Sequence, residues 1–261
     1  MRRLIVEVCA FVHYALSTGK RRSTAENIAA TGRRATRSMV FGVFRLHTGN
    51  IFDMFAASRW NDEKFREWFV FEGREELDRA LAARRGVILV TAHLGSWELG
   101  AIYLQSLGYR LHVVAGVQMN RLLTGAVKDA KEKRGIEVIN PDNSSRKILK
   151  VFQSNGILAL LVDGNMYSGG VEWPLFGRTT HIPDGPVRLA KASGAPIVGG
   201  FCRRTGNNKL SIHVECILSA GDLETLSEKE SLSKMYGAVE RFIADNADQW
   251  CIFRPMWEHM S

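Results

Sequence analysis

The chain has 261 residues, of which 46% are hydrophobic, enough to form one large α/β domain with or without a helical extension. Its net charge of +8 and isoelectric point of about 9.5 favour acidic partners such as anionic lipid headgroups, nucleic acid or an acidic carrier protein. The four cysteines form no C-x-x-C pair and no zinc-type cluster with histidines, so we expect reduced thiols and no metal site.

Residues 1–80 are predicted to be helical throughout and to form a membrane-facing part. Large apolar residues recur between Arg37 and Phe71 at intervals of three or four, which favours helices. The apolar segment Leu4–Leu16 is too short for a transmembrane helix. Two interpretations stay open for it: an amphipathic helix on a membrane surface, or a core helix of an N-terminal bundle.

Residues 81–261 are predicted to form the core of the fold, because strand and helix patterns alternate from Gly86 onward. The expected strands are Val87–Thr91, Leu111–Ala115, Glu137–Ile139, Ile157–Val162, Ile197–Phe201 and Lys209–Val214. The expected helices are Trp97–Ser106, Leu122–Lys133, Arg146–Gln153, Pro186–Ala192 and Leu226–Asn246. This order predicts an α/β fold with a mainly parallel central sheet flanked by helices, after the N-terminal helical extension. The last two strands are expected to form an antiparallel hairpin.

The segment Gly86–Gly100 contains the main candidate for a reaction centre. A buried strand runs into a tight turn that delivers His93, and Glu98 follows five positions later in a helix. A histidine at the end of a strand, oriented by a carboxylate, is suited to act as a general base. Gly95 allows the close turn, and Ser96 is expected to cap the helix. The alternative is a loop histidine and a glutamate that only complements the helix dipole.

A second candidate, Asp163, ends the apolar strand Ile157–Val162. It is expected at the same sheet edge as His93 if the two strands are parallel, where it would position a substrate or only close a turn. The Gly-rich stretch 169–183 is predicted as a long loop over the site. Within and after it, Arg178 and Arg188 are candidates for binding an anionic group, although Arg188 equally suits a solvated helix face.

Several common motifs are absent from the chain. It contains no G-x-S-x-G, no G-x-G-x-x-G, no P-loop and no H-E-x-x-H sequence. These absences disfavour serine hydrolases, dinucleotide enzymes, nucleotide phosphotransferases and zinc proteases. The basic residues are scattered and no recognition motif accompanies them, which disfavours a nucleic-acid binder.

Five sequence blocks carry a resemblance to a known family. They are "TAHLGSWELGA", "EKRGIEVI", "ILALLVDGN", "VRLAKASGAPIV" and "ERFIADNADQW". Their order and spacing, from about Asn27 to Trp250, resemble the bacterial lipid A biosynthesis acyltransferases, a branch of the glycerolipid and lysophospholipid acyltransferases. By this resemblance, His93 corresponds to the catalytic base, Glu98 to its partner, and Arg134 and Asp163 to further site residues.

The resemblance implies an O-acyltransferase at the cytoplasmic face of the inner membrane, held there peripherally. It would move a fatty acyl chain from an acyl carrier protein or coenzyme A thioester to a hydroxyl of a lipid A precursor or similar glycolipid, without a cofactor. A backbone N–H at the Gly95 turn or an arginine would stabilise the oxyanion, and the aromatic N-terminal part would line an acyl groove.

The chain also departs from the lipid A enzymes. Its ending, Cys251-Ile252-Phe253-Arg254-Pro255, looks more like relatives that acylate other glycolipids, including phosphatidylinositol mannosides. Phosphatidylinositol mannoside, a lysophospholipid acceptor, and a non-catalytic membrane lipid-binding protein are therefore the alternative interpretations.

Overall fold

The computed structural model describes residues 2–57, 59–114, 125, 128–129, 131–140, 145–164, 170–206 and 209–257. The N-terminal elements in chain order are α1 (Arg2–Leu16), α2 (Thr18–Ala30), α3 (Arg37–Ala57), α4 (Asp62–Trp68), β1 (Phe69–Glu72) and α5 (Arg74–Ala82). The next are β2 (Val87–Thr91), α6 (Trp97–Ser106), β3 (Leu111–Val114), β4 (Glu137–Ile139), α8 (Ser145–Gln153) and β5 (Ile157–Leu161). The last are β6 (Val171–Leu175), β7 (Arg178–Ile182), α9 (Gly185–Ser193), β8 (Ile197–Arg204), β9 (Leu210–Leu218), α10 (Ala220–Thr225), α11 (Glu228–Asp245) and the 3₁₀ turn η3 (Ala247–Gln249).

Seven of the described strands form a mixed, mostly parallel sheet, as expected from the alternating sequence pattern. Its strand order is β1-β9-β8-β2-β5-β3-β4, and β8 and β9 form the expected antiparallel hairpin. The two most apolar strands, β2 and β5, are parallel neighbours with Thr91 paired to Leu161. Their carboxyl ends therefore lie at the same edge of the sheet.

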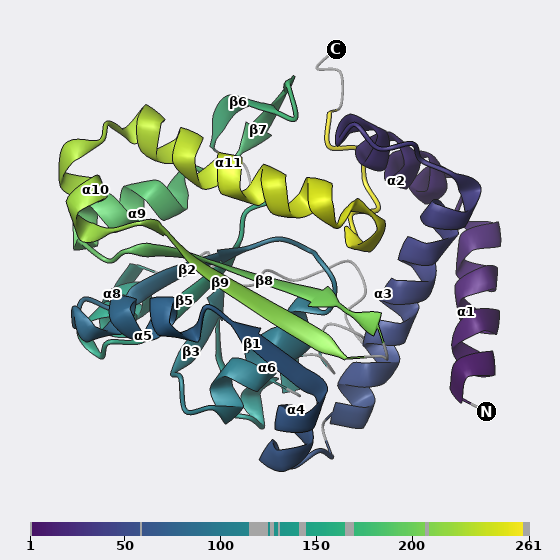
Figure 1. Cartoon of the computed structure of the whole chain (residues 1–261), viewed down its shortest axis with the longest axis horizontal. Helices are drawn as coiled ribbons and strands as arrows, with labels where there is room; N and C mark the ends of the chain where they lie inside the picture. The colour runs from purple at the N-terminus through teal and green to yellow at the C-terminus, as the bar shows by residue number, and fades with distance from the viewer. Residues whose placement is uncertain are drawn as a thin grey trace.

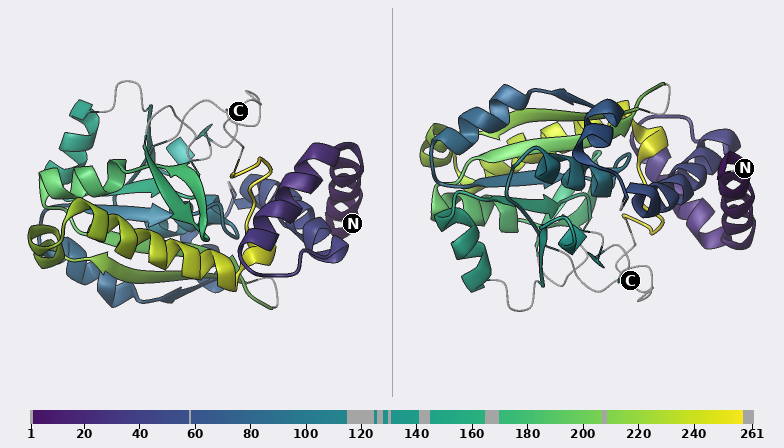
Figure 2. Two further views of the ribbon diagram at one scale, coloured as in Figure 1. Left: turned by 90° about the horizontal axis from the view of Figure 1, so that it is seen from above. Right: turned by 90° about the horizontal axis from the view of Figure 1, so that it is seen from below.

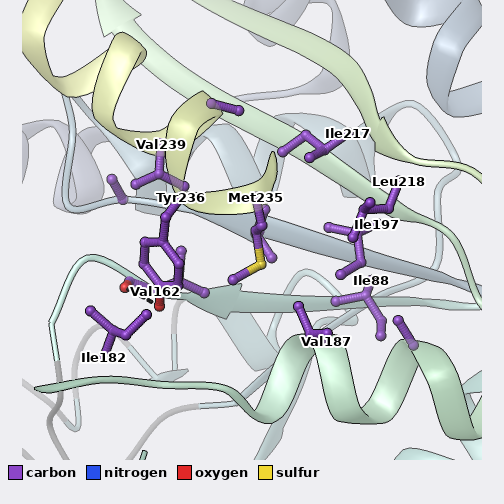
Figure 3. Packing of buried hydrophobic residues seen from close by; sticks show 14 of the residues in the cluster. Ile88, Val162, Ile182, Val187, Ile197, Ile217, Leu218, Met235, Tyr236 and Val239 are labelled. Atoms are coloured by element: carbon purple, nitrogen blue, oxygen red, sulfur yellow. Dashed lines mark hydrogen bonds between the residues drawn. The ribbon is translucent and has the colours of Figure 1, made fainter. Parts of the chain in front are cut away.

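Helices cover both faces of this sheet (Figures 1 and 2). Alternate residues of β2 belong to different cores, because successive side chains of a strand point to opposite faces. Ile88 and Val90 pack with α8, α9 and α11, as Figure 3 shows for part of this cluster, whereas Val87 and Leu89 pack with β1, α4, α5 and α6. Burial on both faces explains why β2 has no polar residue before Thr91.

Helices α1, α2 and α3 stand beside one end of the sheet (Figure 1). A third apolar cluster, which includes Ile28, Val43 and Phe44, joins them to Cys251 and Phe253 near the C-terminus. The N-terminal helices are thereby anchored to the segment that follows η3. Among the described helices, none has the length and apolarity that crossing a bilayer requires.

Two local predictions are wrong. Residues 1–80 are not helical throughout, because Phe69–Glu72 form β1 and extend the sheet beside β9. The stretch 169–183 is not a plain loop, because β6 and β7 pair as an antiparallel hairpin over most of it. Half of the residues of the expected helix Leu122–Lys133 lie outside the described residues.

Candidate functional site

His93 and Asp163 meet at the carboxyl edge of the sheet. Each follows its strand by two residues, and the last paired residues of those strands, Thr91 and Leu161, lie side by side. His93 Nδ1 lies 2.9 Å from Asp163 Oδ1, and the side chain of His93 is 14% exposed whereas that of Asp163 is fully buried. The parallel pairing of two neighbouring strands therefore brings together residues that are 70 positions apart.

Asp163 accepts two further hydrogen bonds through Oδ2. The donors are the backbone N–H of His93, at 2.7 Å, and the indole Nε1–H of Trp250, at 2.8 Å. Burial by itself raises the pKa of Asp163, but the charge of His93 and these hydrogen bonds outweigh it, so the pKa lies below its usual value. Asp163 is consequently an ionised carboxylate.

The ionised Asp163 decides which nitrogen of His93 carries the proton. A carboxylate without a proton can only accept hydrogen bonds, so Nδ1 of His93 must donate. In a neutral imidazole the lone pair is then on Nε2, and no described residue hydrogen-bonds to that atom. The pair is arranged as a histidine base that a buried carboxylate orients.

The turn after His93 is held on both sides at Gly95. Its N–H donates to the carbonyl of Gln249 at 3.0 Å, and its carbonyl accepts from Asn50 Nδ2 at 2.5 Å. The Gly95 N–H is therefore already bonded to Gln249, and stabilisation of an oxyanion by a backbone N–H at this turn or by an arginine stays a prediction. The carbonyl of His93 also accepts from the Cys251 N–H at 2.8 Å.

Replacing Gly95 with alanine is expected to lower the free energy of unfolding by about 3 kcal/mol. Gly95 has φ +56°, and an added Cβ would clash with the carbonyl oxygen of Cys202. Urea denaturation measures the loss. Gly42→Ala is the matched control: Gly42 lies in α3 with open space around it, so alanine there should raise stability by up to about 1 kcal/mol.

Glu98 does not orient His93, so the partner predicted from the His-x4-Glu spacing is corrected. Glu98 lies in the first turn of α6, and its Oε2 is 2.5 Å from Nζ of Lys131. Both side chains of this ion pair are largely buried. No hydrogen bond joins Glu98 to His93, whose Nδ1 is bound by Asp163. Ser96 occupies the N-cap position of α6, but its side chain makes no capping hydrogen bond.

The structure does not bring the predicted arginines to His93. Arg134 donates to the backbone carbonyls of Ala57 and Trp60 and lies 5.0 Å from the ring centre of Phe65, so it holds the end of α3. Arg178 lies over the ring of Trp257 at 4.7 Å. The substrate-binding roles of these two arginines stay predictions.

Arg188, the third predicted arginine, is exposed on α9. Its described ion pair is with Asp184, at 3.7 Å. This placement agrees with the alternative interpretation of Arg188 as part of a solvated helix face. The role of Arg188 in binding substrate also stays a prediction. Within the described residues, no group of three or more His, Cys, Asp or Glu side chains is arranged to hold a metal ion.

A second imidazole, that of His47 on α3, faces the C-terminal segment beside the site. Its ring centre is 5.0 Å from that of Phe253. Burial, followed by the charges of His13, Lys20 and His93, lowers the pKa of His47 from 6.5 to about 4. His47 is therefore neutral in the folded protein at neutral pH.

Because of His47, the protein is expected to lose stability between pH 6.5 and about 4. Over this range the unfolded chain binds a proton at His47 and the folded chain does not, so protonation favours unfolding. The shift corresponds to a loss of about 3 kcal/mol. Urea denaturation at a series of pH values measures this loss in the free energy of unfolding. The loss should be smaller in His47→Asn than in the wild type by about 3 kcal/mol. Equal pH profiles of the two proteins would contradict the prediction.

The sequence identified His93 but missed most of the residues that hold it. They are Trp250, Asn50, Asp53, Arg204 and Gln249. One signal was present: His93 and Asp163 each follow the end of an apolar strand, which suggests a pair once those strands are known to be neighbours. The other contacts join distant segments and have no local sequence pattern.

Comparisons with known proteins agree with the resemblance. The family model described as "Bacterial lipid A biosynthesis acyltransferase" matches residues 32–259. The phosphatidylinositol mannoside acyltransferase of Mycobacterium tuberculosis is 26% identical over 196 residues, which cover 72% of this chain and 60% of that protein. Its counterpart in Mycolicibacterium smegmatis is 26% identical over 219 residues, covering 77% of this chain and 69% of that protein. This chain thus spans about 60% of the length of the Mycobacterium tuberculosis relative.

Proposed function

The chain belongs to the bacterial lipid A biosynthesis acyltransferase family, and from this premise we propose that it moves a fatty acyl chain from a thioester to a hydroxyl of a membrane glycolipid. The observation that carries the proposal is the His93–Asp163 pair. Asp163 binds Nδ1, whereas Nε2 has no hydrogen-bond partner among the described residues and lies at the carboxyl edge of a parallel sheet, where α/β proteins place their sites.

The reaction needs one base. His93 Nε2 takes the proton of the acceptor hydroxyl while the hydroxyl oxygen attacks the thioester carbonyl. A C–O ester bond forms and the C–S bond breaks, and the imidazolium then gives its proton to the departing thiolate. Asp163 fixes the tautomer and stabilises the positive imidazolium.

The proposed donor is an acyl carrier protein or coenzyme A thioester. A thioester is already activated, so the reaction requires no covalent enzyme intermediate and no cofactor. The net charge of +8 favours association with an acidic carrier protein or with the phosphates of coenzyme A.

The proposed acceptor is a phosphatidylinositol mannoside or another glycolipid with a free sugar hydroxyl. The names of the mycobacterial relatives favour this class over a lipid A precursor, and the C-terminal sequence agrees with it. A lipid A precursor and a lysophospholipid are the acceptors to compare with it.

We further propose that the protein acts on the cytoplasmic face of the inner membrane and is attached there through α1. One face of this helix is exposed and apolar: Leu4, Ile5, Val8, Phe11, Val12 and Leu16. The basic residues Lys20 and Arg22 follow and are also exposed. An apolar helix face next to basic residues suits the interface of an anionic bilayer.

Phe11→Asp is expected to weaken binding to vesicles that contain anionic lipid by about tenfold, because Phe11 is 62% exposed on that face. Vesicle sedimentation measures the effect. Leu149→Asp is the control, since Leu149 is similarly exposed but lies on α8, away from α1 (Figure 1). Equal binding by wild type and Phe11→Asp would contradict attachment through α1.

Mass spectrometry of total lipids tests the proposed reaction. A host that makes phosphatidylinositol mannosides and one that makes lipid A are compared with and without the gene, and a lipid that gains one acyl mass identifies the acceptor. The purified protein is then supplied with that lipid and with each thioester donor. A folded protein that binds vesicles but transfers no acyl group from either donor would support a lipid-binding protein instead.

A further inference from the structure

Helix α3 buries a carboxylate that has no part in the proposed reaction. The side chain of Asp53 is 1% exposed. Its Oδ2 accepts from Arg204 Nη2 at 2.6 Å, and its Oδ1 is paired with Arg2 of α1. Burying a carboxylate costs free energy unless the carboxylate is paired. The two arginines offset this cost, but they do not explain what the buried carboxylate does.

The same guanidinium joins Asp53 to Asn50, one turn earlier on α3. Arg204 Nη2 donates to Asn50 Oδ1 at 2.8 Å, and Asn50 Nδ2 donates to the carbonyl of Gly95 at 2.5 Å. The oxygen and the nitrogen of the Asn50 side-chain amide are therefore both hydrogen-bonded, which fixes the orientation of the amide. A continuous polar chain runs from Asp53 through Arg204 and Asn50 to the turn that carries His93.

The opposite side of this turn is attached to the same arginine. Gly95 donates its N–H to the carbonyl of Gln249 at 3.0 Å. The side-chain amide of Gln249 bonds to the backbone of Arg204. Its oxygen accepts from the backbone N–H of Arg204 at 2.7 Å, and its nitrogen donates to the backbone carbonyl of Arg204 at 2.9 Å. Arg204, the last residue of β8, thus connects to both polar groups of Gly95, two positions after His93.

We propose that Asn50, Asp53 and Arg204 form a positioning network that sets the direction of the His93 imidazole. The network acts through His93 and touches no substrate, and its kinetic consequence rests on the proposed acyl transfer. Asp163 holds the Nδ1 side of the ring, and the network holds the peptide that follows the ring. Together they fix where Nε2 lies relative to the acceptor hydroxyl.

Asn50→Asp tests the link directly. Aspartate has nearly the same shape and still pairs with Arg204, but it places a carboxylate oxygen against the Gly95 carbonyl in place of a donor. A small displacement of a catalytic group costs up to about 100-fold, so kcat should fall about 10-fold to 100-fold while KM changes less than about threefold. Arg241→Ala, which breaks an exposed ion pair with Glu215, is the control and should leave kcat unchanged.

A double-variant cycle separates positioning from a general loss of structure. If Asn50 acts through His93, adding Asn50→Asp to His93→Asn causes no further loss of rate. Additive losses, or an unchanged kcat in Asn50→Asp, would overturn the proposal. If Asn50→Asp does not fold, Asn50→Ala, which removes the donor to the Gly95 carbonyl without placing a charge there, replaces it in the same cycle.

A spectroscopic readout keeps the network testable even if the proposed reaction fails. The proton of His93 Nδ1, bonded to Asp163, is observed by NMR and assigned by its absence in His93→Asn. The proposal requires this signal to shift in Asn50→Asp and not in Arg241→Ala. An unmoved signal overturns the network. A shifted signal in a protein that acylates no lipid overturns only the proposed function.

Discussion

Substitution of His93 by asparagine is expected to reduce acyl transfer by about 10³-fold or more. The asparagine amide can still donate to Asp163 from near the position of Nδ1, so the buried carboxylate keeps a partner. The variant has no counterpart of Nε2 and cannot take the proton of the acceptor hydroxyl. Initial rates with a radiolabelled thioester and the lipid found by mass spectrometry give the loss.

The control for His93→Asn is its stability and lipid binding. Unfolding in urea and sedimentation with vesicles should be close to those of the wild type, because α1 and the sheet are untouched. A rate within tenfold of the wild type, in a variant that folds, would show that His93 is not the base. The proposed mechanism would then fail even if acyl transfer itself were observed.

The sequence predicted the central strands well because these strands are buried on both faces. Apolar, β-branched runs such as Val87–Thr91 are strong local signals, and the bounds of β2, β4 and α6 match the expected ones. β1 was missed because its aromatic residues continue the helical spacing of the segment before it. Its strand conformation depends on pairing with Leu210–His213 of β9, a contact that no local pattern shows.

The β6–β7 hairpin was missed for a different reason. Pro174 and the preceding glycines are typical of loops, yet Pro174 lies in a sheet that has two strands among the described residues, so no described third strand needs an N–H from it. Phe176 and Gly177 form the turn, with φ of +51° and +71°. Positive φ at both central residues is typical of a tight hairpin turn.

The site was half predicted from sequence. His93 was found because it follows a strong strand, but short-range spacing selected Glu98 as its partner. The start of α6 directs Glu98 to Lys131 instead, and the true partner comes from the neighbouring strand. Which strands are neighbours depends on the topology of the whole sheet, so the choice between Glu98 and Asp163 required the structure.

Asp163→Asn is expected to lower kcat by about 10³-fold, because an amide can hold the imidazole in the wrong tautomer and cannot stabilise the imidazolium. It should also cost about 2 kcal/mol of stability, since the amide NH₂ faces donors from His93 and Trp250. The pKa of Asp163 is lowered on folding, so its contribution to stability is present above its usual pKa and is lost as the pH falls through the folded value. As the pH falls, the Asp163→Asn variant should therefore lose less stability than the wild type.

Glu98→Gln is the comparison that distinguishes the two carboxylates. It breaks the ion pair with buried Lys131. The variant Lys131→Met breaks the same pair, so it should lose rate and stability by a similar amount. The double variant should lose no more than either single variant. The Nδ1 proton signal of His93 should stay in place in Glu98→Gln and disappear or move in Asp163→Asn. If instead Glu98→Gln moves that signal and Asp163→Asn does not, the glutamate of the His-x4-Glu motif orients the base and the assignment of Asp163 is wrong.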